Sequence, residues 1–228
     1  FFNAVYDAYG RGLMVGESSD LFAPNDSMTR AMLITTLYRM SGSPAVTGEN
    51  PYSDVPAGSY YEKAVIWAMQ KGVANGMGGG KFEPDTTLNR AMVATVLYRL
   101  SGDKVSATNA FPDVPANEWY GEAVAWAQQK GIVTGFEDGT FRPMEEISRQ
   151  DMALMLQRYA KTVKGTDTTP TGDLSRWPDA GLVGSWAVDA LRWCVGAGII
   201  NGKDGGLQPT GNATRAEFAT ILMRYAKL

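Results

Sequence analysis

Apolar residues recur at helical spacing in short segments that alternate with polar loops along this chain. One segment has the i, i+3, i+4 and i+7 spacing of an amphipathic helix. Its apolar residues are Val93, Val96, Leu97 and Leu100. An earlier segment, residues 64 to 68, places alanine, valine and tryptophan on one helical face ahead of Gly72. The pattern predicts two helices joined by a loop, with the first helix ending at the glycine.

This helix-loop-helix pattern occurs four times. The glycine after each first helix recurs at intervals of 60, 59 and 67 residues, and an apolar residue follows it each time. These glycines are Gly12, Gly72, Gly131 and Gly198. We therefore predict repeats at residues 1 to 42, 51 to 102, 110 to 161 and 176 to 228, with a flexible Thr/Gly/Pro-rich linker at 162 to 175. The first repeat lacks the opening segment of the others, so we expect it to be truncated at its N-terminus.

Each loop ends in an aromatic residue or leucine two residues before a proline. These residues are Phe22, Phe82, Phe141 and Leu207. We expect them to hold the loop on the core, while the proline keeps this part of the chain out of a helix. A short polar phrase then begins the second helix. In its last copy Thr214 can cap the helix and Glu217 can reach back, a capping box in which the cap is worth about 1 kcal/mol.

Composition narrows the chemistry of this 228-residue chain. The hydrophobic fraction of 44% and the charged fraction of 20% are typical of a folded protein. A net charge of -3 without a Lys/Arg cluster argues against nucleic acid as a partner. With no histidine and a single cysteine, Cys194, His-based zinc sites and Ser/His or Cys/His catalysis are excluded. We expect Cys194 to be a small buried residue.

We assign no catalytic residue, no cofactor and no metal from the sequence, and we expect no membrane insertion, because no apolar run approaches the roughly 20 residues of a membrane-spanning helix. A calcium site in acidic loops such as residues 135 to 141 is a further alternative, but the loops differ among the copies and none has the D-x-[DN]-x-[DN]-G pattern with a later glutamate.

The second position of the polar phrase is arginine in every copy. These residues are Arg30, Arg90, Arg149 and Arg215. Two interpretations are open: the arginine stem covers apolar surface with its head in solvent, or the guanidinium has a partner. An arginine in the first turn of a helix is poorly placed for the helix dipole, which favours anions there. We favour a partner, either an aspartate of a neighbouring repeat or an anionic ligand.

Several short motifs recur in a fixed order. They are an aromatic-Xaa-Asp-Val opening (YSDV, FPDV), a Trp/Tyr-rich first helix, a Gly-Ile/Val-Xaa-Gly turn, Phe-Xaa-Pro and the Thr/Ser-Arg-Ala-Glu-like phrase. In this order the chain resembles the S-layer homology domain over nearly its whole length. The resemblance implies a mainly α fold, in which tandem repeats form a pseudo-threefold helical spindle with grooves between repeats; here there is an additional partial repeat.

The resemblance also implies a function. Such domains hold exported proteins on the cell wall of mostly Gram-positive bacteria by binding a secondary cell wall polysaccharide, often bearing pyruvate ketals, that is attached to peptidoglycan. The chain is then an extracellular, non-enzymatic module, with S-layer or other surface proteins as possible neighbours. The implied ligand-binding residues are Arg30, Arg90, Arg149, Arg215, Asp54, Asp113, Asp179, Tyr60, Trp119 and Trp186.

Two alternatives remain open at this stage. An aromatic residue at the start of a helix is a core anchor at least as often as a surface on which a sugar stacks. Tyr60, Trp119 and Trp186 could therefore be core anchors. The repeats as a whole could instead form a helical scaffold that binds proteins at the cell surface, with the repeated charges as internal salt bridges.

Overall fold

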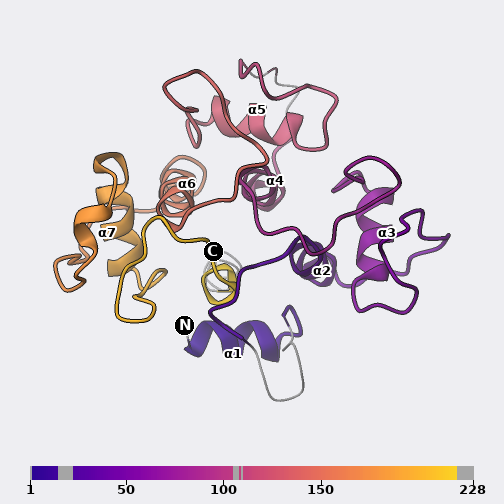
Figure 1. Cartoon of the computed structure of the whole chain (residues 1–228), viewed down its shortest axis with the longest axis horizontal. Coiled ribbons are helices and arrows are strands. Elements are labelled where there is room, and N and C mark those ends of the chain that lie inside the picture. The colour runs from indigo at the N-terminus through magenta and orange to yellow at the C-terminus, as the bar shows by residue number, and fades with distance from the viewer. Residues whose placement is uncertain (1, 15–22, 105–107, 109, 220–228) are drawn as a thin grey trace. The chain divides into compact units, whose positions relative to one another are not determined.

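The computed structural model describes residues 2–14, 23–104, 108 and 110–219. Its regular elements are helices, and β-structure in the described part of the chain is limited to isolated bridges, so the predicted mainly α class is confirmed. The helices are α1 (Phe2–Gly10), α2 (Arg30–Met40), α3 (Glu62–Gln70), α4 (Arg90–Ser101), α5 (Gly121–Gln129), α6 (Arg149–Thr162) and α7 (Val188–Gly196), with 3-10 turns at Ala180–Leu182 and Ser185–Ala187 (Figure 1). Residues 215–219 are also helical.

None of the helices in the described ranges is long and apolar enough to span a membrane. The chain divides into two compact units. Unit 1 consists of Phe1–Thr87 with Thr214–Leu228, and unit 2 of Leu88–Ala213. Each unit therefore contains parts of more than one repeat.

Each first helix ends at its predicted glycine. Gly12, Gly72, Gly131 and Gly198 have φ values of 63° to 69°, the left-handed region that glycine adopts without a steric cost. The apolar residue after each glycine donates its N–H to the carbonyl five residues back, at 2.7 to 2.9 Å. This is the Schellman arrangement, which satisfies carbonyls that the helix end leaves open.

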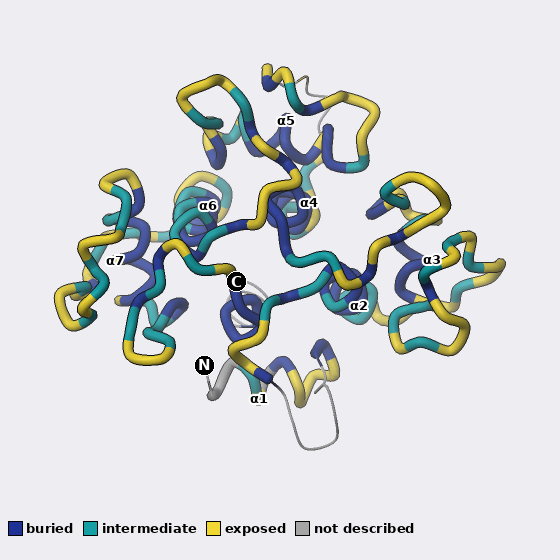
Figure 2. The backbone as a smooth tube through the Cα atoms, viewed as in Figure 1, coloured by how far each residue is buried: buried dark blue, intermediate teal, exposed yellow. Residues whose placement is uncertain are grey.

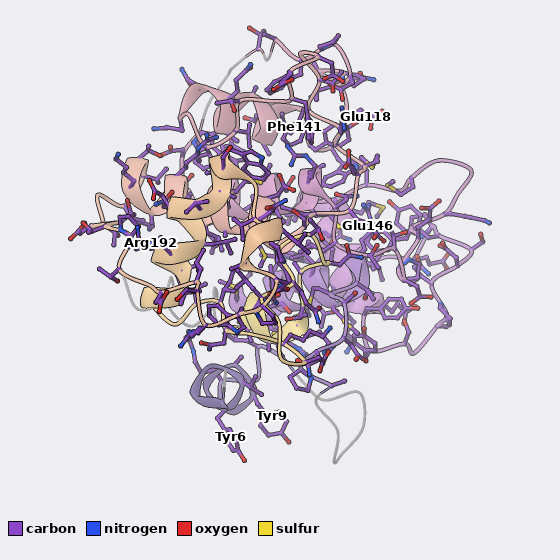
Figure 3. The ribbon with its side chains drawn as sticks, turned by 60° about the vertical axis from the view of Figure 1, so that its left-hand side comes forward. Tyr6, Tyr9, Glu118, Phe141, Glu146 and Arg192 are labelled. Atoms are coloured by element: carbon purple, nitrogen blue, oxygen red, sulfur yellow. The ribbon has the colours of Figure 1, made fainter. Side chains whose placement is uncertain are left out.

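The loops are anchored as expected. Phe82, Phe141 and Leu207 are fully buried, and Phe22 lies outside the described residues. Phe82 packs against Tyr52 with ring centroids 5.5 Å apart, and Phe141 packs against Phe111 at 5.6 Å. In both cases the loop residue meets the aromatic residue that opens its own repeat. Figure 2 shows the resulting contrast between buried helices and exposed loop tips.

The second helices begin at the predicted cap residues. The side chains of Thr29, Asn89 and Ser148 accept the N–H three residues on, at 3.4, 2.9 and 3.1 Å. At the other end of α4, Gly102 adopts a left-handed conformation with φ of 71°. The start of each second helix is thus fixed by local hydrogen bonds that the sequence already indicates.

Each described second helix packs against the first helix of the following repeat. In unit 1, α2 lies against α3; in unit 2, α4 lies against α5 and α6 against α7, and α4 also contacts α6 (Figure 1). Aromatic residues stand at these contacts: Tyr38 and Trp67 have centroids 5.7 Å apart, and Trp126 lies 5.4 Å from Tyr98. The repeats that the sequence delimits therefore interlock.

The segment between the third and fourth repeats packs along α7. Gly172 exchanges hydrogen bonds with Arg192, donating its N–H at 2.9 Å and accepting from the guanidinium at 3.1 Å. A Cβ atom on Gly172 would lie 2.4 Å from the Arg192 carbonyl oxygen, so the two backbones approach as closely as glycine permits. Cys194 of α7 is fully buried, as predicted. The flexibility of residues 162–175 and the threefold spindle stay predictions.

Candidate functional site

The polar phrase of each repeat joins that repeat to another one through the backbone. The N–H groups of Arg30 and Ala31 donate to the carbonyls of Thr86 and Pro84, at 2.8 and 2.9 Å. The same pair of bonds forms at every copy of the phrase. The other pairs are Arg90 with Glu145 and Ala91 with Pro143, Arg149 with Gly211 and Gln150 with Pro209, and Arg215 with Asp26 and Ala216 with Pro24.

These hydrogen bonds show which repeats are in contact within each unit. Within unit 2, the second repeat donates to the third and the third to the fourth. Within unit 1, the first repeat donates to the second and the fourth donates to the first. The helix N-terminus leaves its first N–H groups without an intrahelical partner, so the carbonyls of another repeat satisfy them. All four repeats make this contact, including the first.

The phrase arginines are buried, which rules out the interpretation that their heads lie in solvent. Their exposed fractions are 1% for Arg30, 6% for Arg90, 1% for Arg149 and 3% for Arg215. The guanidinium of Arg149 donates to the carbonyls of Leu207 and Asn201, at 3.0 and 2.8 Å. These carbonyls belong to the next repeat. The arginine side chain therefore reinforces the backbone contact that its own N–H group makes.

Arg90 has two kinds of partner in the next repeat. Its Nε donates to the Phe141 carbonyl at 2.9 Å, and its Nη1 lies 3.1 Å from a carboxylate oxygen of Asp151. Its guanidinium also stands over the Phe136 ring, 4.6 Å from the centroid. In unit 1, Arg215 directs Nη1 to the Met32 sulfur at 2.8 Å, the residue that corresponds to Asp151. The predicted partner in a neighbouring repeat is thus present for Arg90.

The opening aspartates close the loops of their own repeats. Both carboxylate oxygens of Asp113 accept backbone N–H groups, from Phe141 at 2.9 Å and Arg142 at 2.6 Å. Asp54 and Asp179 make the same two bonds at 2.7 to 2.8 Å. The geometry gives these three residues a structural role, and their contact with a ligand stays a prediction.

Burial and neighbouring charges shift the pKa values of the phrase arginine Arg149 and of the opening aspartate Asp179. Burial lowers the pKa of Arg149 to about 10, and the charge of Asp179 opposes that shift. The pKa of Asp179 is lowered, first by the Leu207 N–H bond and also by the charge of Arg149. Arg149 and Asp179 are therefore electrostatically coupled although they belong to successive repeats, and both are ionised at neutral pH.

The two hydrogen bonds from the loop backbone to each opening aspartate form a loop clamp. This loop clamp holds a backbone conformation that the sequence does not reveal. The residue before each repeat proline has a positive φ: 57° at Glu83, 56° at Arg142 and 49° at Gln208. Residues with a side chain rarely adopt this region, and a following proline narrows the choice further. The N–H of each of these three residues is the second donor to the opening aspartate. The carboxylate thus stabilises the turn that the loop needs.

Unit 2 contains a pocket of about 620 Å³ between three consecutive repeats. The loop of the third repeat, residues 132–138, forms one wall, and Asp151, Leu154, Met155 and Arg158 of α6 line another. Arg90 reaches it from the second repeat and Trp186 from the fourth. Of the ten predicted site residues, the pocket brings together these two. It combines apolar surface with three arginines, the third being Arg142.

Trp186 is placed by the turn in which it lies. Its indole folds over Gly184, where a Cβ atom would come within 2.5 Å of the ring nitrogen. The Gly184 N–H donates to the side-chain carbonyl of Gln150 on α6 at 3.0 Å, which ties the turn to the pocket wall. Trp186 remains 50% exposed, so its ring is available to a ligand rather than serving as a core anchor.

The other two predicted aromatic residues have different surroundings. Tyr60 in unit 1 is 54% exposed and makes an edge contact with Tyr61 at 4.9 Å. Burial raises the pKa of Tyr60, and the charges of Arg215 and Arg39 oppose the shift. Trp119 is half-buried with its ring edge-on to Tyr120 at 5.2 Å.

Sequence reasoning missed Arg158 as a pocket residue. The signal was present, because an arginine stands ten residues after the cap residue in every second helix. These are Arg39, Arg99, Arg158 and Arg224, the last of which lies outside the described residues. The separation of ten residues places this arginine in the last turns of the helix, almost three helical turns after the phrase.

A sequence model of the S-layer homology domain matches residues 1–31, 51–92, 110–153 and 178–219. The matches cover most of the chain and include the phrase arginine of all four repeats. The chain belongs to the S-layer homology domain family. Each of its four repeats matches the family separately, which confirms the resemblance inferred from the motifs.

Proteins of known description contain segments similar to this chain. The surface-layer 125 kDa protein of Lysinibacillus sphaericus is 28% identical over 87% of this chain and 16% of its own length. An S-layer protein of Bacillus licheniformis is 28% identical over 88% of the chain and 22% of its length. Exoglucanase XynX of Acetivibrio thermocellus is 31% identical over 66% of the chain and 14% of its length. The chain therefore spans less than a quarter of each of these proteins.

Proposed function

We propose that this chain anchors a protein non-covalently to the bacterial cell wall by binding a secondary wall polysaccharide in the pocket of unit 2. The observation that supports this proposal is the composition of the pocket: three arginines beside a half-exposed tryptophan in a cavity of about 620 Å³. An aromatic ring can stack on the apolar face of a sugar, and guanidinium groups bind carboxylates through paired hydrogen bonds. The cavity volume is in the range of pockets that hold small ligands.

The ligand that fits this chemistry is an acidic sugar, such as one with a pyruvate ketal. A ketal has a single carboxylate, which needs one or two well-placed arginines rather than a basic surface. The net charge of -3 is therefore compatible with an anionic polymer. The same composition distinguishes this pocket from a nucleic-acid site, which would need many phosphate contacts.

The proposal gives the predicted residues unequal roles. Arg90 and Trp186 line the pocket of unit 2, and Arg215 lies near Tyr60 in unit 1 as the corresponding pair. Arg30, Arg149 and Trp119 are assigned to ligand binding by their place in the repeat. Asp54, Asp113 and Asp179 contribute indirectly, because each holds the loop that forms a pocket wall.

We also infer that the chain acts at the cell surface as a non-catalytic module. Two of the relatives are described as surface-layer or S-layer proteins and one as an exoglucanase. Proteins of different description thus share these repeats, as expected if the repeats supply attachment and the rest of each protein supplies another activity. The threefold spindle and S-layer neighbours belong to the same proposal.

Co-sedimentation with Gram-positive wall sacculi tests the function. The purified chain is mixed with sacculi before and after acid extraction of the secondary polymer. Binding that is lost on extraction is the expected result. Equal binding to both preparations would place the ligand in peptidoglycan itself, and no binding to any wall would overturn the proposal.

A protein-binding helical scaffold is the second candidate. The contact between Arg90 and Asp151 favours it, because the repeated charges of a scaffold are expected to be internal salt bridges. A substitution of Arg149 distinguishes the scaffold from the wall anchor if both the stability of the variant and its binding to cell walls are measured. Strong destabilisation at unchanged wall binding below the unfolding transition favours the scaffold.

A further inference from the structure

Arg39 and Arg158 occupy the same position in two repeats and make the same contact. Each lies ten residues after its cap residue, in α2 and α6. Arg158 donates Nη1 to the Ile132 carbonyl at 3.3 Å, and Arg39 donates Nη1 to the Leu13 carbonyl at 3.4 Å. Both carbonyls belong to the apolar residue that follows the glycine at the end of a first helix. The two units thus hold this arginine in one recurring arrangement.

The other two arginines of the unit 2 pocket have carboxylate partners. Arg90 pairs with Asp151 at 3.1 Å. Arg142 pairs with Asp138 at 3.0 Å and with Glu145 at 3.6 Å. The charge of each guanidinium is therefore compensated within the protein, and binding a ligand carboxylate there would compete with an existing ion pair.

Arg158 differs from both. Among the residues that the structure describes it has no ion pair, and its side-chain hydrogen bond to the Ile132 carbonyl leaves most of its five donors unused. The remaining acidic residue of the pocket, Glu137, is exposed on the loop. Burial lowers the pKa of Arg158, and no neighbouring carboxylate opposes the shift. A half-buried cation without a counter-ion is the place where an incoming anion gains most.

We propose that Arg158 is the residue that binds the ligand carboxylate, with Trp186 of the same pocket against the sugar, while Arg90 is primarily structural. Arg39, which makes the corresponding carbonyl contact from α2, has the corresponding role in unit 1. The inference rests on the proposed function and specifies the ligand as an acidic sugar. It moves the anion contact from the first turn of the second helix, where the repeated phrase lies, to the last turns of that helix.

The neighbourhood of Tyr60 supports the parallel. The charges of both Arg215 and Arg39 act on the Tyr60 hydroxyl, as Arg90 and Arg158 share a pocket with Trp186. In unit 1 the phrase arginine again has a partner, the Met32 sulfur. Arg39 is half-buried and, like Arg158, has no ion pair in the described part of the chain. In each unit, therefore, a phrase arginine has a side-chain partner in the fold, while the arginine near the end of the helix has no ion pair among the described residues.

The test uses Arg158→Met and the double variant Arg39→Met/Arg158→Met in the full chain. Two probes are measured: polymer-bearing sacculi by co-sedimentation, and a methyl hexoside bearing a 4,6-pyruvate ketal by calorimetry, with the unsubstituted hexoside for comparison. We expect Arg158→Met to weaken binding of the ketal hexoside about tenfold or more and the double variant to lose sedimentation. Arg158→Lys should retain part of the affinity, because it keeps the charge but not the two-donor geometry.

Arg176→Met is the matched control. It removes the same charge from an exposed residue that stacks on Trp177 and does not line the pocket. Its binding should equal that of the wild type, and circular dichroism with thermal melts should show all variants folded.

The outcomes separate this inference from the proposed function. Wild-type protein that sediments with no wall overturns the function. Wild-type binding that persists in folded Arg158→Met and in the double variant overturns the role of this arginine and leaves anchoring intact. The same holds if Arg158→Met and Arg176→Met weaken binding equally, since the effect would then reflect net charge alone.

Discussion

The guanidinium of Arg90 lies 3.1 Å from the carboxylate of Asp151, and both residues stand in the first turn of the second helix of successive repeats. Their side chains are 8% and 24% exposed, so the pair is largely removed from water. Burial lowers the pKa of Arg90, and the charge of Asp151 opposes the shift. The repeated arginine thus joins one repeat to the next.

This ion pair can be tested by a double-mutant cycle. Arg90→Met should lower the free energy of unfolding of unit 2 by roughly 3 kcal/mol, because it leaves a carboxylate and the Phe141 carbonyl without their donors. Asp151→Asn should cost less, and the double variant should show a coupling of about 1 kcal/mol or more. Urea titration followed by tryptophan fluorescence measures each value. Additive costs would contradict the pair, and Arg176→Met, at an exposed site, should change stability by no more than about 0.5 kcal/mol.

The loop clamp predicts a pH dependence. The pKa of Asp179 is lowered in the folded state, so the folded protein binds fewer protons than the unfolded chain at acidic pH. Its contribution is fully present above the unfolded value of about 3.9 and is lost as pH falls through the lower folded value. Asp179→Asn should therefore reduce stability by about 1 to 2 kcal/mol at pH 7.

Chemical denaturation at several pH values between 3 and 7 checks that expectation. The difference between wild type and Asp179→Asn should be constant from pH 5 to 7 and shrink below about pH 4. A difference that grows on acidification would reverse the sign and exclude the clamp as its source.

Trp186 should affect binding without affecting stability. Its ring is half-exposed and rests on Gly184, whereas Trp126 is fully buried. Trp186→Ala should weaken sugar-polymer binding about three- to tenfold, equivalent to about 1 kcal/mol, with a thermal midpoint within a few degrees of the wild type. Gly184→Ala should mimic part of the loss by displacing the indole. If Trp186→Ala lowers the thermal midpoint strongly instead, the residue is a core anchor.

The capping box of the fourth repeat should be stronger than the simple cap of the first. The Thr214 hydroxyl donates to the fully buried Glu217 carboxylate at 3.0 Å, a bond that alanine would remove, while the first repeat has Met32 at the same position. Thr214→Ala should therefore cost about 2 kcal/mol and Thr29→Ala about 1 kcal/mol.

Hydrogen exchange of the amides at the start of each helix reports this difference locally. Protection should fall near residues 214–217 in Thr214→Ala and near residues 29–32 in Thr29→Ala. Equal losses in both variants would show that the reach-back of Glu217 adds nothing.

The helices, their ends and the family could be predicted from the sequence. Local rules were sufficient for these features: Gly72 terminates a helix because it adopts a positive φ, and Thr214 with Glu217 caps one because their side chains reach the nearby backbone. The burial of Phe82 was likewise predicted from its place two residues before the repeat proline, and that of Cys194 from its small size on the first helix. The four-fold recurrence of short motifs then identified the S-layer homology repeats.

The roles of the repeated charges, in contrast, depend on contacts between residues far apart in the sequence. Asp113 and Phe141 are 28 residues apart in sequence, and Arg90 and Phe141 are 51 apart, so no local rule indicates that they share a hydrogen bond. Recurrence showed that Arg90 and Asp113 matter, but recurrence is the same for a residue that binds a ligand and for one that joins repeats. Arg158 recurs equally, and its place in a pocket without a counter-ion follows from packing between repeats, which depends on where distant segments meet.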